Sequence, residues 1–194
     1  MEKIDPVTEA PKIFYLLNAE DVGHCPPMII RPATLQDLPE VKRLLDAAFA
    51  PSLYESTLVE LIMTGAEIHH GWVALLDSQI AGFILYSVAT NETHPIGWHL
   101  APLAVLPEAQ RQGIGSALVA HSLQSPPLKE EPVFVLGDPA YYERFGFSPF
   151  KTPTCPYDPG NEHFRALRWQ ETATPFTVGY TSAFQLTAQQ LGLE

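Results

Sequence analysis

Basic residues are scarce in this sequence. The chain has 11 lysines and arginines against 22 aspartates and glutamates, and its formal net charge is −11 at pH 7. Proteins that bind nucleic acid do so largely by neutralising phosphates with Lys and Arg, so the scarcity argues against a nucleic-acid partner. The acidic excess weakly favours a cationic substrate, because the field of the whole protein attracts cations over long range.

Long apolar runs are also missing. No stretch approaches the roughly 18 apolar residues that suggest a membrane span. Residues 1–11 mix charge with proline where a secretory signal would carry an apolar segment. We therefore expect no membrane partner and a cytoplasmic location.

Cysteine is rare, with Cys25 and Cys155 far apart in the sequence. Because no export signal precedes them, we expect both thiols to be reduced. Neither the cysteines nor the histidines show the spacing that is typical of zinc ligands, so no metal site is expected.

The chain does have the size and composition of one globular domain. Its 194 residues are 46% hydrophobic and 17% charged, which suffices for a sizeable core. Residues 1–26, rich in proline, are predicted to form an N-terminal arm, and residues 27–194 the compact domain. An apolar patch at residues 13–17 of the arm docks either on the domain or on a partner.

The pattern of apolar residues predicts a mixed α/β fold. Short apolar runs bounded by turn residues indicate strands, and apolar residues three or four apart indicate helices. Asp77-Ser78-Gln79 is predicted to be the turn of a hairpin, and Thr34 and Asp37 are candidate N-caps for the first helix. Strands are expected at 28–31, 72–76, 80–88, 98–105, 133–136, 163–169 and 178–184, and helices from 38, at 57–63, from 114 and from 139 to 146.

A glycine-containing turn lies between an expected strand and an expected helix, with the sequence Gln110-Arg111-Gln112-Gly113-Ile114-Gly115. Free amides at the start of a helix attract phosphate, and glycines let the backbone approach it closely. Ser116 adds a hydroxyl donor and Arg111 a positive charge. The dinucleotide fingerprint requires a third glycine where this chain has Leu118, and the Gly-Lys-Ser/Thr of a P-loop is absent, so neither of those folds is favoured.

The turn resembles the Gln/Arg-x-x-Gly-x-Gly/Ala signature of the GNAT N-acetyltransferase family. The preceding Leu-Ala-Val-Leu-Pro at 103–107 looks like the strand and proline that introduce that signature. Residues 136–147, Leu-Gly-Asp-Pro-Ala-Tyr-Tyr-Glu-Arg-Phe-Gly-Phe, resemble the strand and tyrosine helix of the same family, in particular its bacterial YhbS-like branch. The resemblance runs in order from about residue 28 to 184. It implies a twisted, mostly antiparallel central sheet with one splayed parallel pair and flanking helices.

The resemblance also implies a function. A member of this family moves an acetyl group from acetyl-CoA, its cosubstrate, to a primary amine of a small molecule or peptide by direct attack. A homodimer is possible, because relatives often pair at sheet edges. The runner-up function is a non-catalytic module that binds or senses acyl-CoA. The residues assigned to CoA by resemblance are Leu103, Ala104, Val105, Gln110, Arg111, Gln112, Gly113, Ile114, Gly115 and Ser116.

Two side chains are candidate catalytic residues by the same resemblance. Tyr142 lies four residues before Gly146, where the family places a tyrosine near the CoA sulfur; the alternative is that Tyr141 and Tyr142 are packing aromatics. In many relatives a glutamate on the strand before the turn acts as the general base, whereas here that strand carries His99 and no acidic residue. His99 is therefore the candidate base, with an ordinary pKa of ~6.5. The alternatives are a packing role for His99 and loss of the amine proton to water.

Overall fold

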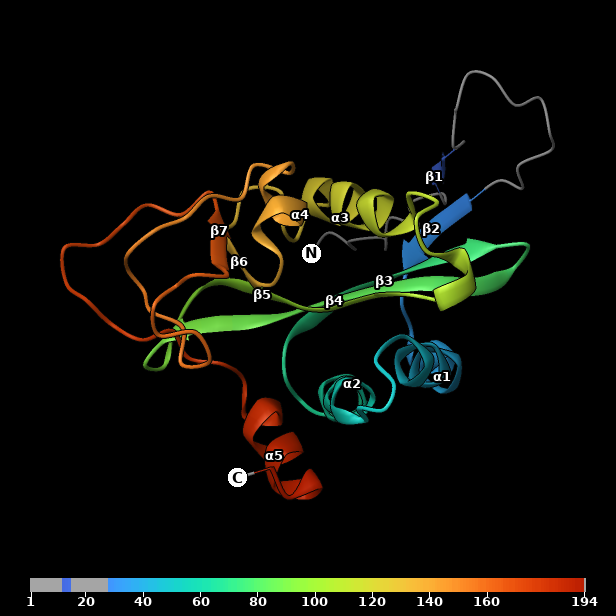
Figure 1. The fold of residues 1–194 in the computed structure, drawn as a ribbon, viewed down its shortest axis with the longest axis horizontal. Coiled ribbons are helices and arrows are strands. Elements are labelled where there is room, and N and C mark those ends of the chain that lie inside the picture. The colour runs from blue at the N-terminus through green and yellow to red at the C-terminus, as the bar shows by residue number, and fades with distance from the viewer. Residues whose placement is uncertain (1–11, 15–27, 194) are drawn as a thin grey trace, which may run out of the picture.

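A computed structural model describes residues 12–14 and 28–193 of the chain. Its described strands form one sheet in which every strand lies beside its neighbours in sequence (Figure 1). All adjacent pairs are antiparallel except β5 and β6, which are parallel. The strands are β1 (Lys12–Phe14), β2 (Met28–Pro32), β3 (His69–Leu76), β4 (Gln79–Asn91), β5 (His94–Val105), β6 (Val133–Leu136) and β7 (Phe164–Leu167).

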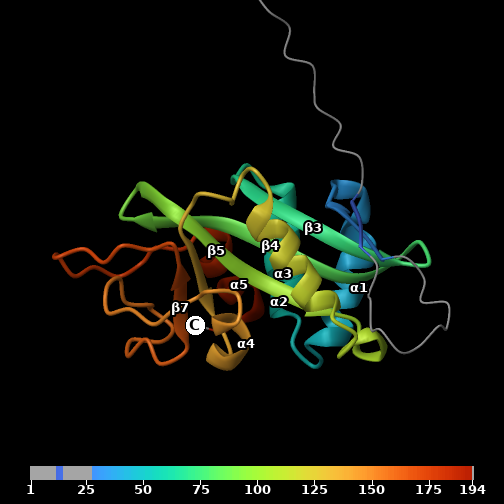
Figure 2. The same cartoon turned by 90° about the horizontal axis from the view of Figure 1, so that it is seen from above.

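Helices cover both faces of this sheet. Figures 1 and 2 show α3 and α4 on one face, and Figure 1 shows α1, α2 and α5 on the other. The helices are α1 (Leu38–Ala48), α2 (Tyr54–Thr64), α3 (Ile114–Gln124), α4 (Pro139–Glu143) and α5 (Ser182–Leu191), and the 3-10 turns are η1 (Leu35–Asp37) and η2 (Pro107–Ala109). The expected mixed α/β fold with a mostly antiparallel sheet and flanking helices is confirmed. In the part of the chain that the structure describes, no helix is both long enough and apolar enough to cross a membrane.

The central strand β4 explains why two layers of helices are needed. Its side chains alternate between the two faces, and both faces are buried. Ile84 and Tyr86 pack in the cluster that includes α3, while Phe83 and Leu85 pack in the cluster that includes α1 and α2. A strand that is apolar on both sides must be covered on both sides, which gives the three-layer arrangement.

The hairpin between β3 and β4 follows the sequence prediction. Asp77 and Ser78 form its two-residue turn, with φ angles of 48° and 67°. Positive φ at both central residues suits the right-handed twist of the strands, and Asp and Ser tolerate it better than branched residues do.

The parallel pair β5 and β6 separates partway along its length. Trp98 to Leu100 pair with Val133 to Val135, and β5 then continues to Val105 paired only with β4. At the separation point β5 carries one extra residue, since Ile84 lies opposite Leu103 and Tyr86 opposite Leu100. A bulge bends its strand and increases the local twist. It thus accompanies the splay that the family resemblance implies.

One sequence prediction for the C-terminal region is wrong. Residues 178–184 were expected to be a strand, but the structure has only an isolated bridge between Gly179 and Thr90, and α5 begins at Ser182. The apolar residues up to Phe184 alternate like those of a strand. Ala183, Phe184 and Thr187 are buried together, however, and that spacing belongs to one face of a helix.

The ends of most other elements also differ from the prediction by a few residues, as in β3, which begins at His69 rather than Trp72, and β7, which spans Phe164–Leu167 rather than 163–169. Helix α2 begins at Tyr54 rather than Thr57, and β5 begins at His94 rather than Trp98. The side chain of Asp37, a candidate N-cap, points toward the residues that precede it. Its Oδ2 accepts hydrogen bonds from the amide of Thr34 at 2.8 Å and from the hydroxyl of Thr34 at 3.0 Å. Its carboxylate also forms an ion pair with Arg31. The guanidinium of Arg31 lowers the pKa of Asp37 to about 2.

Only part of the predicted N-terminal arm lies among the described residues. Lys12–Phe14 pairs antiparallel with Met28 to Ile30, so this end of the apolar patch lies along the sheet edge of the domain. The rest of residues 1–26, with Cys25, lies outside the described residues. Cys155 is buried as a free thiol.

Candidate functional site

The residues of the glycine turn line a cavity at the start of α3. Gly113 is the N-cap of that helix with a φ of 83°, and Arg111 has a φ of 61°. A cavity of about 610 Å³, here called the turn cavity, lies between the end of β5, the start of α3, and α4. Its lining residues are Leu103, Val105, Ala109, Gln110, Arg111, Gly113, Ile114, Gly115, Ser116, Tyr141 and Arg144.

The turn cavity brings together the residues assigned to CoA, apart from Ala104 and Gln112. Ala104 is buried in the opposite layer with α1 and α2, because successive side chains of β5 point to opposite faces. Gln112 is exposed, and its side-chain amide donates to the Glu108 carbonyl at 3.3 Å. Neither of these two residues lines the turn cavity, although the residues before and after each of them do.

Gly115 keeps the turn cavity open. A Cβ at this position would lie 2.9 Å from the Tyr141 hydroxyl and 3.6 Å from Cγ2 of Val105. The backbone at the start of α3 is thus exposed to the cavity by the absence of a side chain. Free backbone amides at a helix N-terminus, with the side chains of Arg111 and Arg144 nearby, have the chemistry of an anion-binding site.

Arg144 is the cation that the sequence analysis missed. Its Nη2 donates to the Ser116 hydroxyl at 3.0 Å, and its guanidinium carbon lies 4.1 Å from the centre of the Tyr141 ring. The available signal was its position in the tyrosine helix, three residues after Tyr141, where both side chains share a face.

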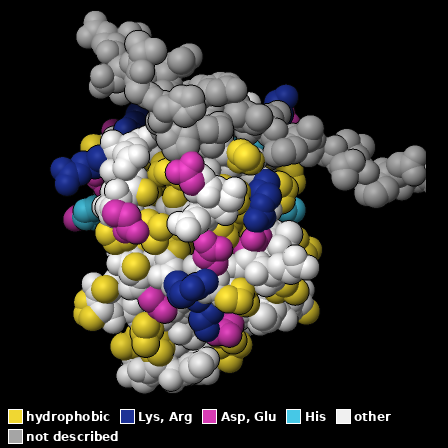
Figure 3. Space-filling view, turned by 90° about the vertical axis from the view of Figure 1, so that its right-hand side faces the viewer, with side chains coloured by type: hydrophobic (Ala, Val, Ile, Leu, Met, Phe, Trp, Pro, Cys, Tyr) yellow, Lys and Arg dark blue, Asp and Glu magenta, His cyan; other side chains and the backbone are white. Residues whose placement is uncertain are grey.

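Local cations matter because the chain as a whole is acidic. On the face shown in Figure 3, acidic side chains lie interspersed with basic and apolar ones. Attraction of an anion must therefore come from the first turn of α3, Arg111 and Arg144, since the net charge of −11 opposes it.

Tyr142 is placed by the short helix α4. Asp138 is the N-cap and accepts from the Ala140 amide at 3.0 Å, and Pro139 occupies the first turn, as predicted. The Tyr142 side chain is 9% exposed and packs edge-on against Phe147. Burial raises its pKa above the ordinary value of about 10, so the phenol keeps its proton at neutral pH.

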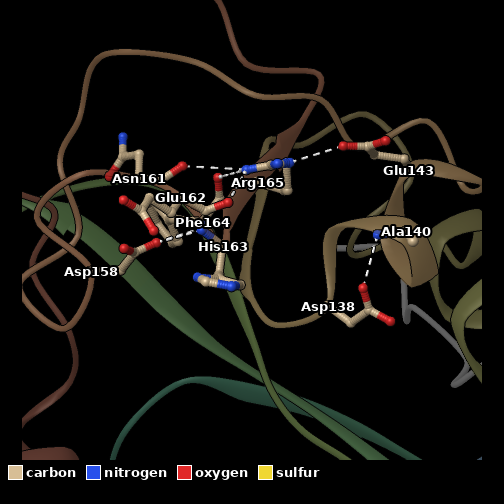
Figure 4. A network of polar contacts seen from close by, with 9 residues as sticks. All are labelled: Asp138, Ala140, Glu143, Asp158, Asn161, Glu162, His163, Phe164 and Arg165. Atoms are coloured by element: carbon tan, nitrogen blue, oxygen red, sulfur yellow. Dashed lines mark hydrogen bonds and ion pairs between the residues drawn. The ribbon is translucent and has the colours of Figure 1, made fainter.

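A polar network fixes α4 against the neighbouring strand (Figure 4). Glu143 Oε1 accepts from Nε of Arg165 on β7 at 3.2 Å. Nη1 of Arg165 donates to the carbonyls of Asn161 and Glu162, and Asp158 Oδ2 accepts from the His163 amide at 2.7 Å. The network therefore ties the helix that carries Tyr142 to β7 and to the preceding loop.

Gly137 leaves room for the Tyr142 ring, which gives a testable expectation. A Cβ at position 137 would lie 2.7 Å from Cε2 of Tyr142. We expect Gly137→Ala to displace the ring and lower turnover at least about tenfold, because a misplacement of roughly 1 Å can cost about 100-fold, while acetyl-CoA affinity changes little. Steady-state kinetics and calorimetry test this, with Gly160→Ala as control because only the flexible Glu162 side chain is near it. Unchanged turnover would show that the ring position is unimportant.

A second cavity lies where β5 and β6 separate. It has a volume of about 240 Å³ and is here called the junction cavity. Tyr142 and Glu55 both line it. Its lining residues are Phe49, Tyr54, Glu55, Leu58, Leu100, Ala101, Pro102, Leu103, Leu136, Tyr142 and Phe184.

Glu55 is the acidic residue that the sequence analysis did not single out. It lies in the first turn of α2 and is the only acidic side chain among the described residues that line the turn, junction and aromatic cavities. The Ser52 hydroxyl donates to Glu55 Oε2 at 2.8 Å, and the Tyr54 amide donates to Ser52 Oγ at 3.1 Å. The signal was the Ser52-Leu53-Tyr54-Glu55 sequence, which has the Ser-x-x-Glu spacing of a capping box.

A third cavity, here called the aromatic cavity, lies beside α2 and α5. It has a volume of about 590 Å³ and is lined by Tyr54, His99, Leu100, Ala101, Leu136, Tyr157, Tyr180, Phe184, Gln185, Ala188 and Leu193. The junction cavity shares Leu103 with the turn cavity, and it shares five residues, among them Tyr54 and Leu136, with the aromatic cavity. The three cavities thus follow one another along β5, with Tyr142 at the middle one.

His99 forms part of the wall of the aromatic cavity. Its side chain is 2% exposed, its ring is stacked on that of Tyr180 at 3.8 Å, and its Nε2 is 3.3 Å from the Gly179 carbonyl. Burial lowers the pKa of His99 to about 3, so the ring is neutral at neutral pH. A group with that pKa is a weak base, which favours the packing alternative; the catalytic role stays a prediction.

The buried His99 makes stability depend on pH. Its folded pKa of about 3 lies below the unfolded value of about 6.5, so the unfolded chain binds an extra proton between these values. We expect His99 to lower the free energy of unfolding by about 1.4 kcal/mol per pH unit as the pH falls below about 6.5. Urea unfolding of the wild type and His99→Gln at pH 7.5, 6.5 and 5.5 would measure it. Parallel pH profiles for the two proteins would contradict it.

Comparison with known proteins agrees with this arrangement. The family model described as "Acetyltransferase (GNAT) domain" matches residues 67–149, which include the glycine turn and α4. The chain is 31% identical over 156 residues to the uncharacterized N-acetyltransferase YhbS of Escherichia coli, covering 78% of this chain and 86% of YhbS. It is 36% identical over 114 residues to the uncharacterized N-acetyltransferase YjhQ of the same organism, covering 55% of this chain and 63% of YjhQ.

Solved structures show the same fold. The crystal structure of Escherichia coli YhbS in complex with CoA superposes with a TM-score of 0.72 at 26% identity, covering 95% of this chain and 96% of YhbS. A GNAT family acetyltransferase from Brucella melitensis, in complex with acetyl-CoA, gives a TM-score of 0.67 at 29% identity over 81% of this chain and 97% of its own. The chain therefore belongs to the GNAT family and is an acyltransferase of that family.

Proposed function

We propose that this protein transfers the acetyl group of acetyl-CoA to the primary amine of a small molecule or peptide. The observation that carries the proposal is the succession of three cavities along β5, with the Tyr142 ring lining the middle one. An enzyme that joins two substrates needs two binding sites that meet at a reacting centre, and the turn and aromatic cavities meet at the junction cavity.

The turn cavity fits the diphosphate of acetyl-CoA. Gly115 leaves the amides at the start of α3 uncovered, and Arg111 and Arg144 supply two positive charges beside them. The free edge of β5 beyond Leu100, which β6 no longer pairs, leads from this cavity toward Tyr142. The similar YhbS and Brucella proteins hold CoA and acetyl-CoA in their crystal structures. When bound, acetyl-CoA supplies the acetyl thioester.

Tyr142 is the proposed proton donor to the leaving sulfur. As the amine nitrogen forms its bond to the acetyl carbon, the carbon–sulfur bond breaks, and the thiolate takes the phenolic proton of Tyr142. The proton that the nitrogen releases returns to the phenolate through solvent, which balances the reaction. Because burial raises its pKa, Tyr142 enters each turnover protonated.

The same residues distinguish an enzyme from the non-catalytic module. A module that only senses acyl-CoA has no need of a protonated phenol in the junction cavity or of a further cavity beyond it. Incubation with acetyl-CoA and a broad panel of amines, while free thiol is followed, tests the proposal. Thiol release above the amine-free rate is expected. Tight CoA binding without such release would leave the binding module as the function.

A further inference from the structure

We propose, on the basis of the acetyl transfer proposed above, that the acceptor is a small primary amine on an apolar, aromatic-sized body. The aromatic cavity holds the body, and Glu55 in the junction cavity holds the ammonium group and takes its proton. Glu55 then serves as the general base, a role for which the part of β5 that lines the cavities offers only the buried His99.

The walls of the aromatic cavity select for an apolar body. Tyr54, Tyr157, Tyr180 and Phe184 all line it, and none of its described lining residues is an acid or a lysine or arginine. The ring of Tyr180 contacts three others: it stacks on His99, and it packs edge-on against Tyr157 at 5.0 Å and Phe184 at 4.8 Å. Rings held in this way offer flat apolar faces. Against them, the hydroxyl groups of a sugar or the ammonium groups of a polyamine would lose water without gaining hydrogen-bond partners.

Exposed apolar surface gathers at the same cavity. Seven large hydrophobic side chains are exposed among the described residues, and Leu136, Tyr157 and Leu193, at 41%, 56% and 64% exposure, all line the aromatic cavity. Apolar groups that face a concave site rather than the core are typical of ligand pockets, and a volume of about 590 Å³ suits a small molecule.

Glu55 is placed for the amine end of such a molecule. It lines the junction cavity together with Tyr142, and Tyr54 and Phe184 line both this cavity and the aromatic one. One oxygen of Glu55 accepts from Ser52, which orients the carboxylate and leaves further acceptor capacity. The titratable groups beside it in the junction cavity are Tyr54 and Tyr142, and both are neutral at pH 7 because burial raises their pKa values.

The proton transfer that this placement allows is simple. The ammonium group gives one proton to the Glu55 carboxylate, and the neutral amine that results attacks the acetyl carbon. Glu55 then releases that proton to solvent before the next turnover. Without a carboxylate at this point, the enzyme would depend on the small fraction of amine that is already neutral in solution.

The first test compares acceptors that all carry a primary amine but differ in the rest of the molecule. Thiol release from acetyl-CoA is measured at pH 7.5 with 2-phenylethylamine, tryptamine, ethanolamine, putrescine and a short peptide with a free N-terminus. We expect kcat/KM for the two aromatic amines to exceed that for ethanolamine by roughly 30-fold, from burial of one ring. Preference for ethanolamine, putrescine or the peptide overturns the proposal, although the acetyl transfer itself would stand. Thiol release with none of them, when calorimetry shows acetyl-CoA bound, overturns both.

The second test uses matched variants. Glu55→Gln keeps an acceptor for Ser52 and is expected to lower kcat/KM for 2-phenylethylamine about 100-fold at pH 7, with part of the loss recovered at pH 9 and with acetyl-CoA affinity unchanged. Glu60→Gln, on the same helix but paired with Lys42 outside the cavities, is the control. Equal activity and equal pH profiles for the two variants would exclude Glu55 as the base.

A third variant tests the apolar wall. Tyr157→Ala is expected to raise KM for 2-phenylethylamine about tenfold while kcat and KM for acetyl-CoA stay near the wild-type values. Tyr157 is more than half exposed, so its truncation leaves the fold intact. Ile68→Ala removes an apolar side chain that is also more than half exposed but lies outside the three cavities, and it should change neither constant. An unchanged KM in Tyr157→Ala would contradict the placement of the acceptor body.

Discussion

Replacing Tyr142 by phenylalanine is expected to lower kcat about 100-fold and to leave the affinity for acetyl-CoA within about twofold. The hydroxyl is the only group lost, so the ring still packs against Phe147 and beside Tyr141. The departing thiolate then loses the phenolic proton that Tyr142 supplies, which raises the barrier of that step alone. Steady-state kinetics and calorimetry on the same preparation measure the two effects separately.

Tyr86→Phe is the matched control for this experiment. Tyr86 is also a buried tyrosine whose pKa burial raises, but it lies outside the three cavities and donates to or accepts from Ser122 at 2.7 Å. Its loss should reduce the free energy of unfolding by about 1 kcal/mol and leave kcat unchanged. Turnover of Tyr142→Phe near that of Tyr86→Phe would remove Tyr142 from the mechanism.

Gly115→Val is expected to weaken CoA binding by at least about 100-fold, because lost contacts with a diphosphate combine with steric exclusion. The new side chain would occupy the space that the turn cavity keeps open between Tyr141 and Val105. The clash within the protein is with the far end of the Tyr141 side chain, which can rotate away. The variant should therefore fold, and thermal unfolding should show a midpoint close to that of the wild type.

Gly160→Val is the control for Gly115→Val. It adds the same side chain to a loop where only Glu162 lies nearby, outside the turn cavity. Calorimetric titration with CoA should give the wild-type affinity for this control. If Gly115→Val also retained that affinity, the diphosphate would have to bind elsewhere.

The sequence predicted the parts of the site that depend on local backbone chemistry. The glycine turn, the Asp138 cap and the short β6 strand were all expected near the positions where the structure has them. Each rests on a residue type with a strong local preference: glycine for positive φ, aspartate for a helix N-cap, β-branched residues for a strand.

The parts that were missed depend on contacts between distant segments. The region of α5 was expected to be a strand because a short alternating run does not reveal which face will be buried. Arg144 and Ser116 are 28 residues apart, and Glu55 and Tyr142 lie on different elements, so no local pattern shows that they share cavities. The homodimer, the cytoplasmic location and the absence of a nucleic-acid partner stay predictions.

We infer that the exposed amides at the start of α3, helped by two arginines, bind the diphosphate of CoA against the field of an acidic protein. Calorimetric titration of the full chain with CoA and, in parallel, with pantetheine, which lacks the diphosphate and nucleotide, tests it most directly. We expect CoA to bind at least about 100-fold more tightly than pantetheine. Equal affinities for the two compounds, or no heat with CoA at millimolar concentration, would contradict the claim.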